Sequence, residues 1–95
     1  MRPELLSDPH SSVKNLNGWS LSADGKTISK SYTFKDFKEA FAFMTKAGAI
    51  ADAMDHHPDW TNVYNKVDIR LSTHDKGGLT NLDIELAQKI DSIQK

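Results

Sequence analysis

The sequence predicts an α+β fold in which a four-stranded antiparallel sheet carries helices on one face, in the order β-β-α-β-β-α. Three observations lead to this prediction: an alternating segment with an Asp-Gly pair inside it, two segments with helical spacing, and a second alternating segment between them. We divide the 95 residues into an N-terminal arm, residues 1–17, and a single two-layer domain, residues 18–95. A domain this short buries only roughly 60–65 % of its unfolded surface, so self-association would help to stabilise it.

Composition excludes several classes of function. The net charge of −1, with 26 % charged residues, gives no basic face for nucleic acid. The absence of cysteine excludes disulfides and thiolate metal sites. No apolar run approaches the ~18 residues of a membrane span, and residues 1–13 lack the apolar centre of a secretory signal. We therefore expect a cytoplasmic protein that binds neither nucleic acid nor membrane.

The arm is rich in residues that break helices and favour turns, including Pro3 and Pro9. We expect it to be largely irregular, with short ordered pieces at 4–6 and 13–16 at most. His10 is then a solvated side chain.

The first two strands are expected near residues 19–23 and 26–34, where apolar and polar residues alternate. Between them stands Asp24-Gly25, a strong hairpin signal because Gly accepts the positive φ of a tight turn. The strands should therefore pair antiparallel.

A long helix follows. Asp36 with Glu39 three positions later resembles a capping box, and Pro58 requires the helix to end near Asp55 or His56. The apolar stripe that we expect to face the core consists of Phe37, Ala40, Phe41, Met44, Gly48 and Ala51.

A second pair of strands is expected at 61–64 and 66–73, separated by a turn at Asn65. His74 ends the longer strand, and a Gly-containing loop follows it. Thr80 then caps a last helix, whose apolar stripe is Leu82, Leu86, Ile90 and Ile93.

Three of the four histidines, His56, His57 and His74, fall within residues 52–83. Because the unperturbed pKa of histidine is about 6.5, such a cluster is a candidate site for moving protons. Asp52 lies four residues before His56 and could orient its ring, or it could be a solvated helix residue. The adjacent histidines suit two different tasks, or they meet the negative end of the helix dipole.

Other interpretations stay open. Histidines and carboxylates are zinc ligands, yet no two of the clustered histidines have the spacing of a helical His-x-x-x-His pair. Trp60 and Tyr64 could stack on a flat heteroaromatic ligand, or they could belong to the core or a subunit interface. Asp83 is explained by a capping box with Thr80.

The residues carrying this cluster resemble a known family. Asp52, His56-His57-Pro58, Tyr64, His74 and Asp83 have the spacing of the pterin-4a-carbinolamine dehydratase signature. The resemblance extends over about residues 18–91 and includes Gly18-Trp19, the segments 34–37, 43–44 and 56–65, Thr73-His74-Asp75 and the segment 77–80. Members usually have an additional N-terminal helix, from which residues 1–17 depart. Asp52 stands where Glu is common.

The resemblance implies a hydro-lyase that dehydrates 4a-hydroxytetrahydropterin to quinonoid dihydropterin in tetrahydrobiopterin recycling, without cofactor or metal. It assigns His56 and His74 to proton exchange with the leaving hydroxyl and N5, and His57 mainly to holding the substrate. Substrate-binding positions would be Asp52, Trp60, Ser72 and Thr73, with Asp83 in support. It also implies a homodimer or a dimer of dimers.

Two other functions stay open. One animal member of the family also acts as a dimerisation cofactor of a transcription factor, so a protein-interaction module is the first alternative. A zinc hydrolase is the second.

Overall fold

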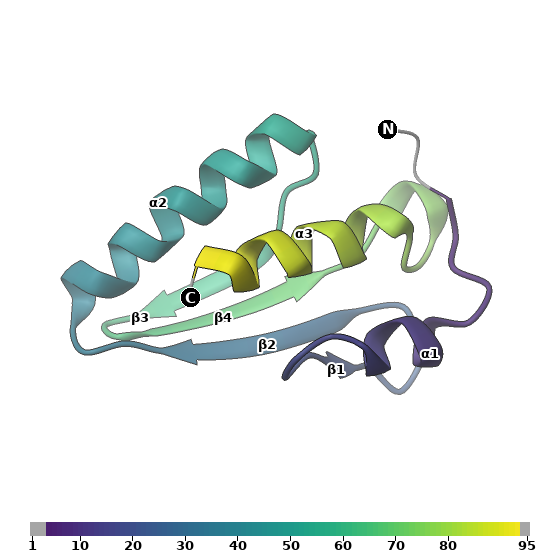
Figure 1. Cartoon of the computed structure of the whole chain (residues 1–95), viewed down its shortest axis with the longest axis horizontal. Helices are drawn as coiled ribbons and strands as arrows, with labels where there is room; N and C mark the ends of the chain where they lie inside the picture. Colours follow the sequence, from purple (N-terminus) through teal and green to yellow (C-terminus); the bar gives the residue numbers. More distant parts are fainter. Residues whose placement is uncertain (1–3, 94–95) are drawn as a thin grey trace.

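The computed structural model describes residues 4–93 and has the predicted β-β-α-β-β-α order from residue 20 on (Figure 1). The elements are α1 (Pro9–Lys14), β1 (Ser20–Leu21), β2 (Ile28–Thr33), α2 (Phe37–Met54), β3 (Asp59–Val63), β4 (Lys66–Leu71), the 3₁₀ helix η1 (His74–Lys76) and α3 (Asn81–Ile93). Residues 94–95 of the predicted domain and residues 1–3 of the predicted arm lie outside the described residues.

The four strands form one antiparallel sheet in the order β1-β2-β4-β3, which confirms the predicted fold class. Helices α2 and α3 lie on the same face of this sheet (Figure 1). The sheet register pairs Ile28 with Leu71 and Asp59 with Arg70. The start of β2 and the start of β3 therefore flank the end of β4 on opposite sides.

Both hairpin turns use a residue with positive φ. Gly25 has φ 73°, and its N–H donates to the carbonyl of Ser22 at 2.9 Å. Between β3 and β4 the residue with positive φ is Tyr64, at 51°, next to the predicted turn residue Asn65. The sequence thus predicted both reversals, although β1 is only two residues long.

The core lies between the sheet and the two long helices. Along β4 the alternation confirms the strand prediction, because Val67, Ile69 and Leu71 are buried. They meet a buried stripe on α3 that includes Leu86 and Ile90. The cap of α3 is Thr80, as predicted, with its hydroxyl accepting from the N–H of Leu82 at 3.3 Å.

The predicted core stripe of α2 is partly wrong. Phe37 and Phe41 are 46 % and 57 % exposed and stack on each other, with ring centroids 5.6 Å apart. Phe43 is buried instead, against Tyr32 and Phe34. The other buried residues of the helix are Ala40, Ala47 and Ala51. The buried face is therefore rotated by about 60° around the helix axis from the predicted one, because three aromatic rings fill the space over the sheet.

The prediction of an irregular arm is also wrong for part of its length, because Pro9–Lys14 form α1. Proline is tolerated at the first helical position, where its missing N–H would have no helical partner. The side chain of Asp8 caps the helix by accepting from the N–H of Ser11 at 3.3 Å. Val13 is buried in the main core, so packing stabilises a helix too short to form alone. His10 is exposed, as predicted.

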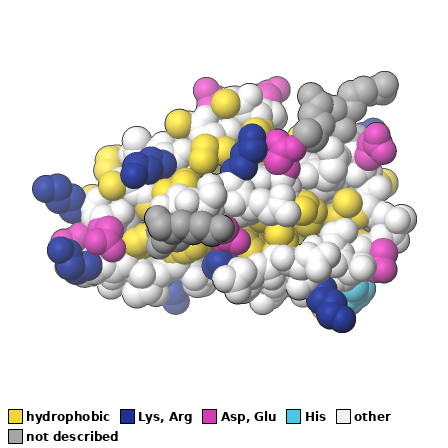
Figure 2. Space-filling view, in the orientation of Figure 1, with side chains coloured by type: hydrophobic (Ala, Val, Ile, Leu, Met, Phe, Trp, Pro, Cys, Tyr) yellow, Lys and Arg dark blue, Asp and Glu magenta, His cyan; other side chains and the backbone are white. Residues whose placement is uncertain are grey.

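The face drawn in Figure 2 carries basic and acidic side chains interspersed with hydrophobic ones. This mixture agrees with the small net charge of the sequence. Within residues 4–93, no helix has the length and apolar character needed to cross a membrane.

Candidate active site

The helix α2 ends just before the first two histidines. Asp55 adopts the left-handed conformation, with φ 52° and ψ 41°, and its N–H donates to the carbonyls of the last turn. Asp is one of the few residues that adopt this conformation readily. Pro58 then keeps His57 extended, so the chain turns from the helix towards β3.

The third histidine reaches the same end of the sheet from β4. Asp59, the first residue of β3, pairs with Arg70 near the end of β4. The residues that precede β3 therefore lie beside those that follow β4. A left-handed Gly77, with φ 71°, closes the η1 turn that begins at His74.

These segments border an open hollow of about 240 Å³. All three predicted histidines line it, together with the predicted Ser72 and Thr73 and two further carboxylates. The full lining is Asp55, His56, His57, Ser72, Thr73, His74 and Asp75. The structure thus brings five of the predicted site residues together.

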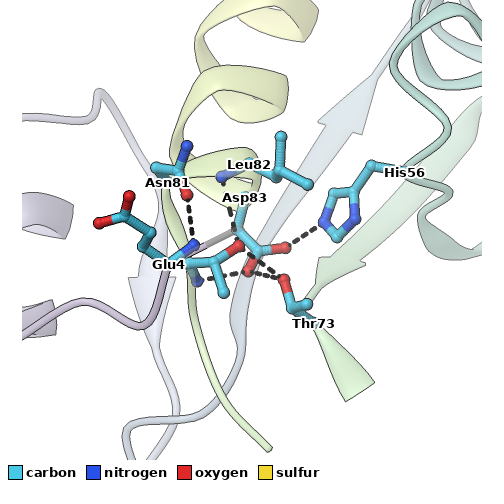
Figure 3. A network of polar contacts seen from close by, with 7 residues as sticks. Glu4, His56, Thr73, Asn81, Leu82 and Asp83 are labelled. Carbon is cyan, nitrogen blue, oxygen red and sulfur yellow. Dashed lines mark hydrogen bonds and ion pairs between the residues drawn. The ribbon is translucent and has the colours of Figure 1, made fainter. Parts of the chain in front are cut away.

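His56 is held by a buried carboxylate. Its Nε2 atom lies 2.5 Å from Oδ1 of Asp83, in the first turn of α3 (Figure 3). The residue His56 is 9 % exposed and Asp83 is fully buried. Such a contact fixes the orientation and the tautomer of the ring, because the nitrogen facing the carboxylate must carry a proton.

The second oxygen of Asp83 is held by a chain of donors (Figure 3). Oδ2 accepts from the N–H of Thr80 and from the hydroxyl of Thr73, each at 2.9 Å. Because the Thr73 proton points to Asp83, the Thr80 hydroxyl must donate to Thr73 Oγ1, 2.8 Å away. Thr80 in turn accepts from the N–H of Leu82. This chain completes the capping box predicted for Thr80 and Asp83 and keeps the carboxylate in place.

The other ring nitrogen of His56 is accessible. In the part of the chain that the structure describes, every buried side-chain nitrogen and oxygen has a hydrogen-bond partner. His56 bonds Asp83 through Nε2, and Nδ1 has no partner among the same residues. Nδ1 must therefore reach the surface, and the hollow is the surface that His56 lines. In the neutral ring, Nδ1 is the proton acceptor.

Asp52 does not orient His56, contrary to one of the two interpretations of its spacing. Its Oδ1 atom lies 3.2 Å from Nε2 of His57 instead, and both side chains are exposed. The helix ends at Met54, so His56 no longer follows the four-residue helical spacing from Asp52. Asp52 is also absent from the lining of the hollow.

Trp60 lies elsewhere too. It is half-buried, and its Cη2 atom would lie 3.9 Å from a Cβ at Gly48 of α2. It packs between β3 and α2 and does not line the hollow with the histidines.

Two lining carboxylates were not predicted as site residues. Asp55 enters the hollow through the left-handed end of α2, and Asp75 follows His74 in η1. The Asp-His-His-Pro order is the signal that could have indicated Asp55, because an Asp before a proline turn is a common helix end.

The acidic and basic groups near β3 pair with each other. The guanidinium of Arg70 contacts both oxygens of Asp59 at 3.3 Å. This hydrogen-bonded contact holds the pKa of the Asp59 carboxyl below its usual value. Between residues 4 and 93, no group of three or more His, Asp or Glu side chains has the geometry to hold a metal ion.

Comparison with known proteins adds an independent finding. A family model described as "Pterin 4 alpha carbinolamine dehydratase" matches residues 6–93. A protein of Mesorhizobium japonicum, named provisionally as a pterin-4-alpha-carbinolamine dehydratase, is 54 % identical over 79 residues, covering 83 % of this chain and 81 % of its own. A protein of the same provisional name from Sinorhizobium medicae is 52 % identical over 93 residues, covering 96 % and 89 %.

Among solved structures, a crystal structure from Brucella melitensis has the same fold. Its TM-score is 0.88 at 40 % sequence identity, over 97 % of this chain and 98 % of the other. That protein is described as a transcriptional coactivator/pterin dehydratase.

Proposed function

The chain belongs to the pterin 4 alpha carbinolamine dehydratase family, and from this premise we propose that it dehydrates a 4a-hydroxytetrahydropterin by histidine acid-base catalysis. The family is one of hydro-lyases. The observation that carries the proposal is the hollow lined by His56, His57 and His74. In the cell, this reaction would return the oxidised pterin to tetrahydrobiopterin recycling, in the cytoplasm.

The chemistry requires two proton transfers. The bond between C4a and the hydroxyl oxygen breaks, and the departing oxygen takes up a proton to leave as water. N5 loses its proton, and the electron pair of that bond forms the C4a–N5 double bond of the quinonoid product. Positioned acids and bases typically accelerate such steps about 10² to 10⁴-fold, and these transfers need no redox cofactor.

His56 is the base in this proposal and accepts the N5 proton on Nδ1. Its ring gains positive charge in that step, and the neighbouring Asp83 carboxylate stabilises that charge. The contact also keeps the proton of the neutral ring on Nε2, which leaves Nδ1 free to accept. Asp83 is therefore a positioning residue and touches no reacting atom.

His74 is the acid that protonates the leaving hydroxyl. It lies across the hollow from the α2 end, on the segment that follows β4, and its side chain is exposed. The exposure lets it regain a proton from water after each turnover. His57 mainly holds the substrate, and its contact with Asp52 limits the directions in which its ring can point.

The remaining family positions contribute to binding. Ser72 and Thr73 border the hollow and in this proposal form the wall against which the pterin ring lies. Asp52 and Trp60 lie outside this hollow, so their effect on substrate binding is indirect. Asp52 acts through its contact with His57, and Trp60 acts through its position in β3.

A stopped-flow assay with freshly generated 4a-hydroxytetrahydropterin tests the proposal. The parent protein should accelerate dehydration, and His56→Ala and His74→Ala should each lower the rate at least tenfold while circular dichroism shows an intact fold. His10→Ala is the matched control, because His10 is exposed on α1. Equal rates in the parent and both site variants would refute the assignment.

We also propose that the chain forms a homodimer or a dimer of dimers. The support is an apolar flank of α2, made of Phe37 and Phe41, that is exposed in the single chain. A Cβ added at Gly48 of the same flank would lie 3.9 Å from Cη2 of Trp60, so the flank lies on the side of β3. Beyond it, the β3–β4 hairpin exposes Val63 and Tyr64, at 73 % and 62 %. Exposed apolar patches often mark association surfaces.

A protein-interaction module is the second candidate, because the same flank could bind a helix of another protein. Recovery of a stable foreign partner by a protein that turns over no pterin would favour it over the enzyme.

A further inference from the structure

A second hollow adjoins the histidine site. Its volume is about 250 Å³, and it shares three lining residues with the first hollow: Ser72, Thr73 and His74. Its other walls are Asp24, Lys26 and Thr27 of the β1–β2 turn and the glycines 77 and 78. Because β2 and β3 flank β4 on opposite sides, the turn lies on one side of segment 72–74 and the histidine pair lies on the other. That segment is therefore a ridge between two hollows.

The two hollows together match one extended ligand better than either does alone. Each is smaller than the roughly 300–1,000 Å³ of a small-molecule site, but their combined volume falls within that range. A ligand with a flat ring in the histidine hollow and a substituent crossing the ridge at Ser72 would occupy both.

The second hollow offers charged groups of both signs. The Cγ atom of Lys26 would lie 3.9 Å from a Cβ at Gly78, so the stem of this lysine rests over the glycine. Its ammonium makes no hydrogen bond or ion pair with the residues that the structure describes. Asp24 stands two positions earlier in the same turn.

The Asp24 carboxylate is held in place within the turn. Its Oδ1 atom accepts from the hydroxyl of Ser22 at 2.6 Å and from the N–H of Lys26 at 3.0 Å. These bonds, led by that from Ser22, lower the pKa of Asp24, so the carboxylate is ionised at neutral pH. The hollow thus presents a fixed acceptor and a free donor, and Thr27, the residue after Lys26, also lines it.

We infer that this second hollow binds a hydroxylated C6 substituent of the pterin, an inference that rests on the proposed function. A hydroxyl both donates and accepts, so a chain with two or more hydroxyls can bond the carboxylate and the ammonium together. An anionic substituent would be attracted by Lys26 and repelled by Asp24. An alkyl substituent would form a hydrogen bond with neither. Lys26 and Asp24 are then specificity-determining residues that lie outside the acid-base site.

The experiment compares two substrates, the 4a-hydroxy forms of a 6-(dihydroxypropyl)tetrahydropterin and of 6-methyltetrahydropterin. In the parent, kcat/KM should be higher for the hydroxylated substrate. Lys26→Met should lower kcat/KM for that substrate about tenfold, mainly through KM, as expected for loss of a charge-assisted hydrogen bond. The loss for the 6-methyl substrate should be at least fivefold smaller.

Two further variants sharpen the comparison. Lys26→Arg should restore most of the preference, because it keeps the cation. Lys14→Met is the matched control at an exposed lysine of α1, and it should keep the parent's ratio. Equilibrium binding of the stable 7,8-dihydropterins with the same two substituents should show the same preference without turnover.

The outcomes separate the inference from the proposed function. Turnover of both substrates with an equal loss in Lys26→Met, or with no loss, overturns the inference and leaves the dehydratase intact. A stronger preference for a carboxylated substituent than for the hydroxylated one also overturns it. If the protein neither turns over nor binds any pterin, both the inference and the proposed function are overturned.

Discussion

The Nε2 atom of His56 lies 2.5 Å from the Oδ1 atom of Asp83, although the two residues are 27 positions apart. The contact joins the end of α2 to the first turn of α3 and crosses the interior of the domain. The same carboxylate caps α3 and receives the hydroxyl of Thr73. The start of α3 and the orientation of the His56 imidazole therefore depend on one side chain.

Asp83→Asn should lower the dehydration rate at least tenfold. The amide keeps the shape of the carboxylate, but only its oxygen can accept a hydrogen bond. If the oxygen faced Nε2 of His56, the Thr80 N–H would lose its acceptor. If the oxygen stays on the Thr80 N–H, the NH₂ group faces Nε2. The ring would then favour the tautomer with its proton on Nδ1, which removes the proposed base. Nitrogen NMR shifts of His56 would report the tautomer, and stopped-flow kinetics would report the rate.

Asp52→Asn is the matched control, because Asp52 pairs with the exposed His57. We expect its rate within a few-fold of the parent's. A large loss in this variant and none in Asp83→Asn would reverse the roles that we give to the two carboxylates.

Thr73→Val should destabilise the fold by about 1–3 kcal/mol, because the buried hydroxyl of Thr80 and the carboxylate of Asp83 each lose a partner. Urea unfolding would measure the free energy. Thr33→Val, at an exposed position of β2, is the control, and it should change the free energy of unfolding by less than about 0.5 kcal/mol. Equal stability of both variants would show that the hydroxyl chain contributes nothing.

Local patterns were sufficient to predict the order of elements. The Asp24-Gly25 turn, the Asp36 cap, Pro58 and the Thr80 cap each act on their own neighbours in sequence, so each limits where an element begins or ends. Predicting the long helix needed only these signals and a stripe of apolar residues, and its observed bounds, Phe37–Met54, agree.

Long-range packing was harder to predict. The rotation of α2 depends on which of several phenylalanines fits against Tyr32 and Phe34, and sequence spacing alone does not decide this. The partner of His56 was hard to predict for the same reason, because Asp52 is near His56 in sequence but Asp83 is near it in space. The helix α1 was missed because it depends on the packing of Val13 in the core, and the sequence does not show where that core lies.

Phe41→Ser should shift the protein towards smaller assemblies. It removes half of the stacked pair from the exposed flank of α2, where a second copy is proposed to bind. Light scattering after size exclusion would measure the mass as a function of concentration. Lys46→Ser is the control on the opposite flank of the helix. A parent protein that is monomeric at the highest concentration would remove the proposed interface.

Gly48→Ala should stabilise the protein by up to about 1 kcal/mol, because alanine favours the interior of a helix. The added Cβ would lie 3.9 Å from Cη2 of Trp60, an ordinary van der Waals contact. Gly25→Ala is the contrasting variant and should destabilise, since Gly25 has φ 73° in the hairpin turn. Thermal unfolding would measure both. A destabilised Gly48→Ala would mean that Trp60 cannot tolerate the contact.

Stability should fall as the pH rises above about 10, and Tyr32 should contribute to the fall. Burial raises the pKa of the Tyr32 hydroxyl, and its hydrogen bond to Asp91 adds to the effect. A raised pKa in the folded state means that the unfolded chain loses this proton first. The stabilisation is therefore complete below the unfolded pKa and is lost as the pH rises towards the folded pKa.

Tyr32→Phe removes the titrating group and should give a shallower decline of unfolding free energy between about pH 9 and 11. Asp91 keeps the indole N–H of Trp19 at 3.0 Å and the ammonium of Lys30 at 2.8 Å, so the variant leaves its carboxylate partnered. The other groups that titrate in this range are common to both proteins, so the difference between the two slopes isolates Tyr32. Urea unfolding at a series of pH values measures the slopes, and equal slopes would mean that Tyr32 ionises as easily in the folded domain as in the unfolded chain.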